Sequence, residues 1–138
     1  LGCGTGALIP TLVNKGYEVT GVDASDNMLE IARKNNSDVE FIKKDASKLD
    51  FCNQFDGVFS NAVFHWIDDQ NGLLKSINNA LKTGGQLVCE FGGKGCAETV
   101  HSELERLFAK RGLKYKRTFY FPTILSFFKF KFAIFIFY

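Results

Sequence analysis

Residues 1–6 have the sequence LGCGTG and lead directly into the apolar positions of a helix. Glycines at alternate positions allow a tight turn and a close approach of the backbone to a ligand. A loop that ends at a helix N-terminus favours negative charge, because free N–H groups and the helix dipole point toward it. The stretch therefore predicts a ligand-binding loop in an α/β protein.

An acidic residue, Asp23, follows the loop by about 20 residues, at the end of the next predicted strand. At that spacing a carboxylate can bind the hydroxyl groups of a ribose. Loop and acid together indicate a ligand that contains a nucleoside. A dinucleotide such as NAD is one option, because Gly2, Gly4 and Ala7 satisfy the pattern G-x-G-x-x-A. A solvated loop acid is the plain alternative for Asp23.

Strand patterns and helix patterns alternate along the chain. This order predicts an α/β fold that is Rossmann-like, with a mostly parallel sheet and helices on both faces. Strands are expected at residues 18–22, 39–42, 56–60 and 86–91. Helices are expected up to Gly16, from Ser25 or Asp26 onward, from Asp68 to the KTGG turn at 82–85, and ahead of Gly112.

Size and composition fit one soluble domain, with 138 residues, 46% apolar and 23% charged. All 15 acidic residues precede Arg106, so the remainder of the chain is strongly basic. The stretch KRGLKYKR at 110–117 could bind a nucleic acid. Cations at a helix C-terminus are the commoner explanation, and no nucleic-acid-binding module accompanies them. We therefore expect no nucleic-acid partner.

The cysteines argue for free thiols. None of the four lies in a C-x-x-C pair, and the chain has only two histidines. We expect no metal site, and a reducing, cytoplasmic compartment.

Five stretches, taken together and in this order, carry a resemblance to a known family. They are LGCGTG (1–6), GVDASDNMLEIARKN (21–35), KKDASKL (43–49), FDGVFSNAVFHWI (55–67) and LKTGGQLVCEFGGKG (81–95). The chain resembles class I S-adenosylmethionine-dependent methyltransferases, and among them the trans-aconitate methyltransferases and similar small-molecule enzymes. The stretches after residue 23 disfavour the NAD option. The resemblance implies S-adenosylmethionine as cofactor and a small-molecule methyl acceptor. We expect no membrane partner, and the sequence leaves the oligomeric state open.

The resemblance also implies roles for eleven residues. Those that would bind the cofactor are Gly2, Cys3 and Gly4 at its methionine part, Asp23 at the ribose, Ala24 and Met28 beside the adenine, Asp45 and Ala46 at the adenine amino group, and Asn61 beneath the methionine part. His65 and Trp66 would lie near the transferred methyl group or the acceptor. The open alternatives are that Asp45 only caps a short turn, that His65 is a contact residue rather than a general base, and that Trp66 only packs.

Two departures from the family pattern are expected. The family has an apolar strand, ending in an acid, that runs into the glycine loop and forms the centre of the sheet. We expect that first central strand to be missing. Residues 1–122 would form a partial methyltransferase domain and residues 123–138 an aberrant apolar tail. That tail is either a strand of the sheet, as FFKFKF at 127–132 suggests, or sequence foreign to the parent fold; its longest apolar run is too short for a membrane span.

The functional expectation is methyl transfer from S-adenosylmethionine to a small molecule, for which a carboxylate is one option. A truncated remnant without enzymatic activity is the alternative. An NAD-dependent oxidoreductase is less favoured.

Overall fold

The computed structural model describes residues 1–93, 95–117 and 133–137. Its strands are β1 (Thr20–Asp23), β2 (Glu40–Lys43), β3 (Phe55–Asn61), β4 (Leu81–Glu90) and β5 (Ala133–Phe137). Its helices are α1 (Ile9–Asn14), α2 (Asp26–Asn35), α3 (Gln70–Ala80) and α4 (Glu98–Lys110), with 3₁₀ turns η1 (Ala46–Lys48) and η2 (Phe64–Trp66). The alternation of parallel strands and helices confirms the predicted α/β class.

The strands form two sheets where the sequence predicted one. β1 pairs with β2, β3 and β5 flank β4, and every pair is parallel. Residues 1–3 lie between the sheets and bond to both. The Leu1 nitrogen donates to the Phe59 carbonyl (2.7 Å), and the Cys3 N–H donates to the Val22 carbonyl (3.0 Å). This segment lies where the resemblance implies a central strand, and β1 and β3 belong to different sheets.

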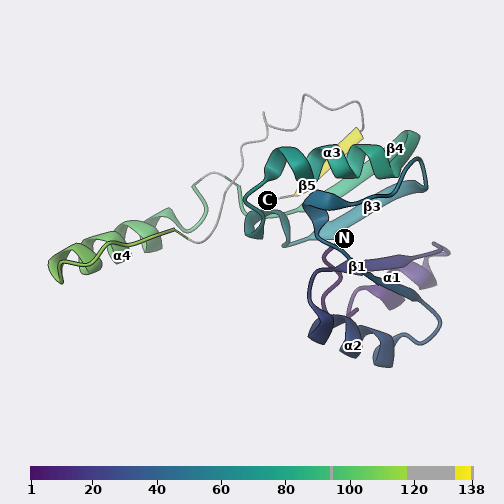
Figure 1. The fold of residues 1–138 in the computed structure, drawn as a ribbon, viewed down its shortest axis with the longest axis horizontal. Coiled ribbons are helices and arrows are strands. Elements are labelled where there is room, and N and C mark those ends of the chain that lie inside the picture. Colours follow the sequence, from purple (N-terminus) through teal and green to yellow (C-terminus); the bar gives the residue numbers. More distant parts are fainter. Residues whose placement is uncertain (94, 118–132, 138) are drawn as a thin grey trace.

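Each of the two sheets, which are seen apart in Figure 1, has its own apolar core. The larger core lies between α3 and the β3–β4 pair, and its fully buried members are Phe64, Leu73, Leu74, Ile77, Leu87 and Cys89. The smaller core joins α1 and α2 to β2, through Ile9, Leu29, Ala32 and Phe41. Leu1 packs against the larger core and Cys3 against the smaller. The first three residues therefore connect the two cores as well as the two sheets.

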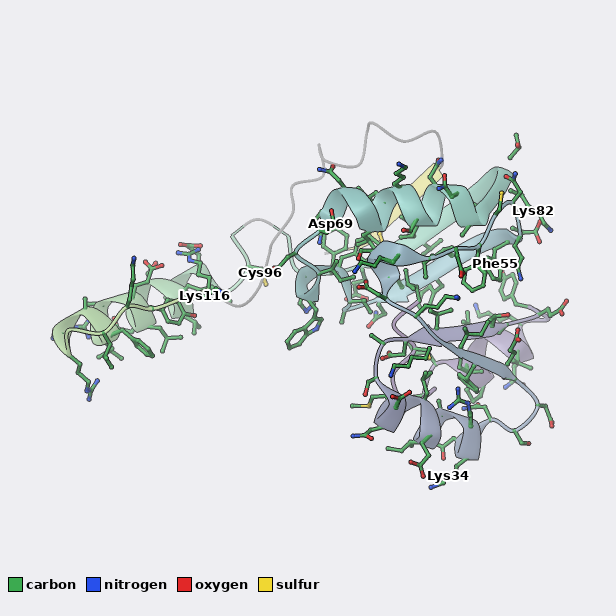
Figure 2. The ribbon with its side chains drawn as sticks, viewed as in Figure 1. Lys34, Phe55, Asp69, Lys82, Cys96 and Lys116 are labelled. Carbon is green, nitrogen blue, oxygen red and sulfur yellow. The ribbon has the colours of Figure 1, made fainter. Side chains whose placement is uncertain are left out.

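The ends of the elements differ from the predictions at two places. Asp69 caps α3, accepting the Gly72 N–H at 2.9 Å, whereas Asp68 was predicted. The KTGG turn lies inside β4, because the ladder jumps from the Phe55–Leu81 pair to the Gly57–Gln86 pair. Figure 2 labels Phe55 and Lys82 at this amino end of the β3–β4 pair, and Asp69 at the opposite end of α3. The other predicted strands agree with the structure to within two residues.

Helix α4 lies apart from both sheets and is covered by the segment that follows it (Figure 1). The Tyr115 hydroxyl lies 2.7 Å from His101 Nδ1. The Arg117 guanidinium pairs with Glu98 at 2.8 Å and with Glu105 at 3.1 Å. One cation of the basic stretch is thus neutralised by the helix.

The tail is described over Ala133–Phe137, which form β5 on the free edge of β4. The FFKFKF stretch and the expected boundary at residues 122 and 123 lie outside the described residues. In the part that is described, no helix is long and apolar enough to cross a membrane.

Candidate functional site

The glycine loop leaves the gap between the sheets at the carboxyl ends of β1 and β3. Gly2 and Gly4 have φ of +66° and +53°, a region that L-residues rarely adopt. A Cβ atom on Gly2 would lie 2.2 Å from Val63 Cγ2, so Gly2 is also required by crowding. A Cβ on Gly4 would meet nothing within 4 Å. The loop is therefore packed against the protein at Gly2 and open to solvent at Gly4. Its backbone at Gly4 is accessible to a ligand, and we call this open backbone the cradle.

Asp23 holds this loop from the end of β1. Its Oδ2 accepts the Gly4 N–H at 2.8 Å, and its Oδ1 accepts the Ser25 N–H at 2.9 Å. The half-buried carboxylate is thus fixed beside the loop, which a solvated loop acid would not be. Each carboxylate oxygen retains a lone pair for a further donor.

Asp45 reaches the same edge from the end of β2, since the Lys44 N–H donates to the Asp23 carbonyl at 3.0 Å. Asp45 caps η1 by accepting the Ser47 N–H at 2.9 Å and the Ser47 hydroxyl at 2.8 Å. These bonds lower the pKa of the Asp45 carboxyl below its usual value. The turn-capping alternative is therefore present in the structure, and the exposed carboxylate remains accessible to a ligand.

The remaining residues near Asp23 and Asp45 are partly or fully exposed to solvent. Ala24 and Met28 are exposed at the beginning of α2, with Met28 44% exposed, and Ala46 is half-buried in η1. An exposed methionine and alanine next to Asp23 form an apolar surface on which a flat ring can lie.

Asn61 ends β3 and is bound to Glu90 at the end of β4. Its Nδ2 donates to Glu90 Oε2 at 2.7 Å, and the Ala62 N–H donates to the Glu90 carbonyl at 2.7 Å. Ala62 has φ of +55°, an uncommon conformation for alanine. Sequence reasoning missed Glu90, because its contact with Asn61 depends on the register of β3 against β4, which no local pattern signals.

The turn η2 follows and carries His65 and Trp66. Phe64 anchors it in the larger core, and the Gln70 side chain donates to the Phe64 and Ile67 carbonyls at 2.7 Å each. Burial lowers the pKa of His65, so its ring is neutral near pH 7. Trp66 is 64% exposed, with its ring centroid 5.6 Å from that of His65, so packing alone does not account for it.

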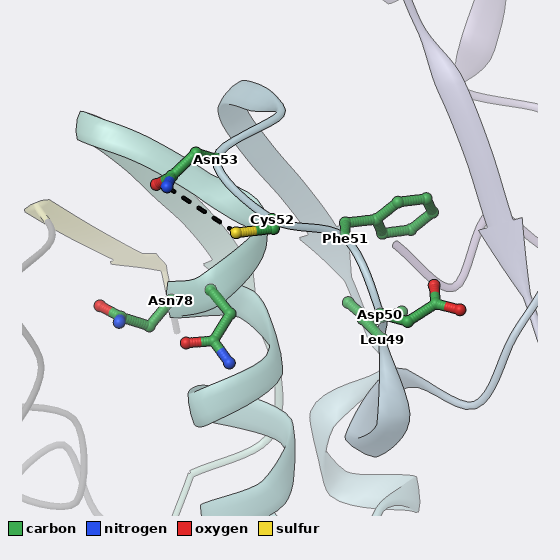
Figure 3. Close-up of a pocket in the computed structure, with 7 residues that line it drawn as sticks. Leu49, Asp50, Phe51, Cys52, Asn53 and Asn78 are labelled. Carbon is green, nitrogen blue, oxygen red and sulfur yellow. Dashed lines mark hydrogen bonds between the residues drawn. The ribbon is translucent and has the colours of Figure 1, made fainter.

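The residues implied by the resemblance all lie on the loop or at the carboxyl ends of β1, β2 and β3, or in the segments that follow them. Parallel α/β sheets bind ligands at this edge. The open hollow in Figure 3 lies elsewhere, at the amino end of β3, and is lined by residues 49–53, 78 and 79. It contains none of the implied residues. Within the described ranges no three His, Cys, Asp or Glu side chains are grouped so as to hold a metal ion, and all four cysteines are free.

Residues 1–89 match the family model described as a methyltransferase domain. The chain belongs to this methyltransferase family. The match covers the glycine loop, β1 to β3 and most of β4, and thus every residue of the candidate site except Glu90.

Proteins similar to the chain include named methyltransferases. The chain is 33% identical to a malonyl-[acyl-carrier protein] O-methyltransferase of Priestia megaterium, over 82% of this chain and 43% of that protein. It is 36% identical to a trans-aconitate 2-methyltransferase of Rhizobium rhizogenes, over 65% of this chain and 36% of that protein. The chain thus spans less than half the length of these relatives.

A solved structure shares the fold as well. The phosphoethanolamine N-methyltransferase 2 of Haemonchus contortus, solved in complex with S-adenosyl-L-methionine, superposes with a TM-score of 0.66 at 30% identity, over 84% of this chain and 28% of that one.

Proposed function

We propose that the chain binds S-adenosylmethionine at the carboxyl edge of β1 and β3, as part of an enzyme that methylates a small molecule. The attachment of the Gly2–Gly4 loop to Asp23 carries this proposal, because it places an open backbone cradle beside a fixed carboxylate. The match of residues 1–89 to the methyltransferase family supports it.

In this proposal, different residues along the carboxyl edge bind different parts of the cofactor. The Gly2, Cys3 and Gly4 backbone lines the methionine part, and Asn61 lies beneath it. Asp23 accepts hydrogen bonds from the ribose hydroxyls. Ala24 and Met28 flank the adenine ring, while Asp45 accepts from its amino group, next to Ala46.

The bound cofactor supplies a methyl group already activated on a sulfonium. The protein then has to orient the acceptor and exclude water, which is the larger part of such catalysis. The exposed Trp66 ring offers a wall for the acceptor. A carboxylate acceptor needs no base, whereas a hydroxyl or amine acceptor could pass its proton to His65, which is neutral because its pKa is lowered.

The names of the relatives support a carboxylate acceptor, since malonyl groups and trans-aconitate both carry carboxylates. The free thiols support a reducing, cytoplasmic compartment. A second candidate function is a remnant that binds the cofactor without catalysis. The separation of the two sheets favours this candidate.

Isothermal titration with S-adenosylhomocysteine and with NAD tests the proposal. The sulfur ligand should bind in preference to NAD. Asp23→Ala should weaken its binding by about 1–3 kcal/mol, the range for losing hydrogen bonds to a charged group. Asp38→Ala, a change at an exposed acid before β2, is the control and should leave affinity unchanged. Binding of NAD alone would overturn the proposal.

A turnover assay distinguishes an active enzyme from a remnant that only binds the cofactor. Incubation with S-adenosylmethionine and a panel of dicarboxylic and tricarboxylic acids should release S-adenosylhomocysteine. Binding without release of S-adenosylhomocysteine, with any of these acids or with hydroxyl and amine acceptors added to the same assay, would favour the remnant.

A further inference from the structure

Glu90 joins the carboxyl ends of two neighbouring strands. It is aligned with Asn61 in the parallel register of β3 and β4. Its carboxylate accepts the Asn61 side-chain amide, and its backbone carbonyl accepts the Ala62 N–H, both at 2.7 Å. The side chain that ends β3 and the backbone that leaves it are therefore both attached to one residue of β4.

The chemistry of this pair fixes the orientation of the Asn61 amide. An ionised carboxylate only accepts hydrogen bonds, so it can face the NH₂ group of an amide but not its oxygen. The Asn61 Oδ1 must then point away from Glu90. Over the described ranges, no hydrogen bond occupies that oxygen. An asparagine beside a hydroxyl or a second amide would have either orientation available.

The backbone next to Asn61 is constrained in the same way. Ala62 has φ of +55°, which an L-residue adopts at an energetic cost. The bond from its N–H to the Glu90 carbonyl holds the chain in that conformation as it leaves β3. Glu90 thus sets both the position and the rotation of the Asn61 side chain.

We propose that Glu90 is a positioning residue of the ligand site, which turns Asn61 Oδ1 toward the carboxyl edge as a hydrogen-bond acceptor. The group it faces is the methionine part of the cofactor, whose ammonium is a donor. This inference rests on the proposed function, in which Asn61 lies beneath that part. Glu90 itself does not touch the ligand.

Two ligands tested on the full chain distinguish positioning from general support of the fold. S-adenosylhomocysteine carries the methionine-derived part and adenosine lacks it. Glu90→Ala should lower the affinity for S-adenosylhomocysteine by about three- to tenfold, the range for one hydrogen bond, and leave that for adenosine unchanged. The affinity of Glu90→Gln for S-adenosylhomocysteine should lie between those of the wild type and Glu90→Ala, because a glutamine amide can bond to either end of the Asn61 amide and no longer dictates its orientation. Glu40→Gln, the same change at the amino end of β2, is the control and should match the wild type.

Exchanging the amide and the acid between positions 61 and 90 provides a rescue experiment. Asn61→Asp sets two carboxylates against each other and should lower both the melting temperature and the affinity for S-adenosylhomocysteine. Adding Glu90→Gln restores one donor and one acceptor, and both quantities should recover most of the loss. The Asn61 side-chain amide resonances in a ¹⁵N spectrum should also shift in Glu90→Gln and stay unchanged in Glu40→Gln.

The outcomes separate this inference from the proposed function. If the wild type binds S-adenosylhomocysteine and Glu90→Ala binds it equally well, the positioning role is overturned and the proposed function stands. An equal loss for both ligands, or no recovery in the double variant, would also overturn it. If the wild type binds no S-adenosylhomocysteine, the proposed function fails, and this inference fails with it.

Discussion

Gly2 and Gly4 share a backbone conformation but differ in what surrounds them. Both have positive φ, so alanine at either position should cost about 1 kcal/mol through backbone strain. At Gly2 the new methyl group would also collide with Val63, which adds about 1–3 kcal/mol of overpacking. We therefore predict that Gly2→Ala lowers the free energy of unfolding more than Gly4→Ala does.

Urea unfolding of the two variants measures this difference. Val63→Ala combined with Gly2→Ala should recover part of the loss, because it removes the two methyl groups that collide. Equal losses at the two glycines would contradict the crowding seen at Gly2.

His65 predicts a dependence of stability on pH. Burial lowers its pKa in the folded state below 6.5, so the unfolded chain binds more protons between the two pKa values. The contribution of His65 to stability is therefore fully present above about pH 6.5 and is lost as the pH falls below that value. In His65→Gln the free energy of unfolding should change less between pH 7.5 and pH 5.5 than in the wild type. Identical changes would show that His65 is equally hydrated in both states.

At the scale of elements, Gly21 allows β1 to approach β2. A Cβ atom at Gly21 would lie 2.4 Å from the Phe41 ring and 3.2 Å from Cys3 Sγ. Gly21→Ala should therefore destabilise the protein by about 1–3 kcal/mol. Gly57→Ala in β3 is the matched control, because its Cβ would meet only the Gln86 carbonyl at 3.7 Å, an ordinary contact. Thermal melts of both variants test this, and an equal effect would contradict it.

Local sequence predicted the elements better than their boundaries. Periodicity and glycines placed α2, α3 and the first three strands, because each rests on short-range pattern. The cap of α3 was wrong by one residue, since Asp68 and Asp69 are adjacent and only the geometry of the turn selects between them. The extension of β4 through KTGG depends on pairing with Phe55, which no local pattern encodes.

The residues of the candidate site also divide into those that local sequence predicts and those that only the fold shows. The loop and Asp23 could be predicted because their spacing along the chain reflects one strand–helix unit. Glu90 could not, because its bond to Asn61 joins residues 29 positions apart. The exposure of Trp66 also required the fold, since an aromatic residue next to a buried phenylalanine resembles a core residue in sequence.

At the scale of the whole molecule, β1 and β3 both face the gap that residues 1–3 enter. An apolar segment of about five residues ending in aspartate, added ahead of Leu1, could pair with both strands. Each hydrogen bond gained should contribute about 0.5–1.5 kcal/mol. We predict that this extension raises the melting temperature, whereas a Gly-Ser extension of equal length does not. Slower amide exchange in β1 and β3 should accompany the rise, and unchanged melting would contradict the prediction.

The two apolar cores have no residue in common. Among the described residues, the cores are joined through Leu1–Cys3 and through the segment after β2, where Ala46 and Leu49 pack against the larger core. Small domains usually unfold in one step, but units with few contacts between them can open separately. We expect the part of the chain with β1 and β2 to open while α3, β3 and β4 remain folded. Since Asp23 and Asp45 belong to the first part and Asn61 to the second, a ligand that contacts all three would unite two folding units into one.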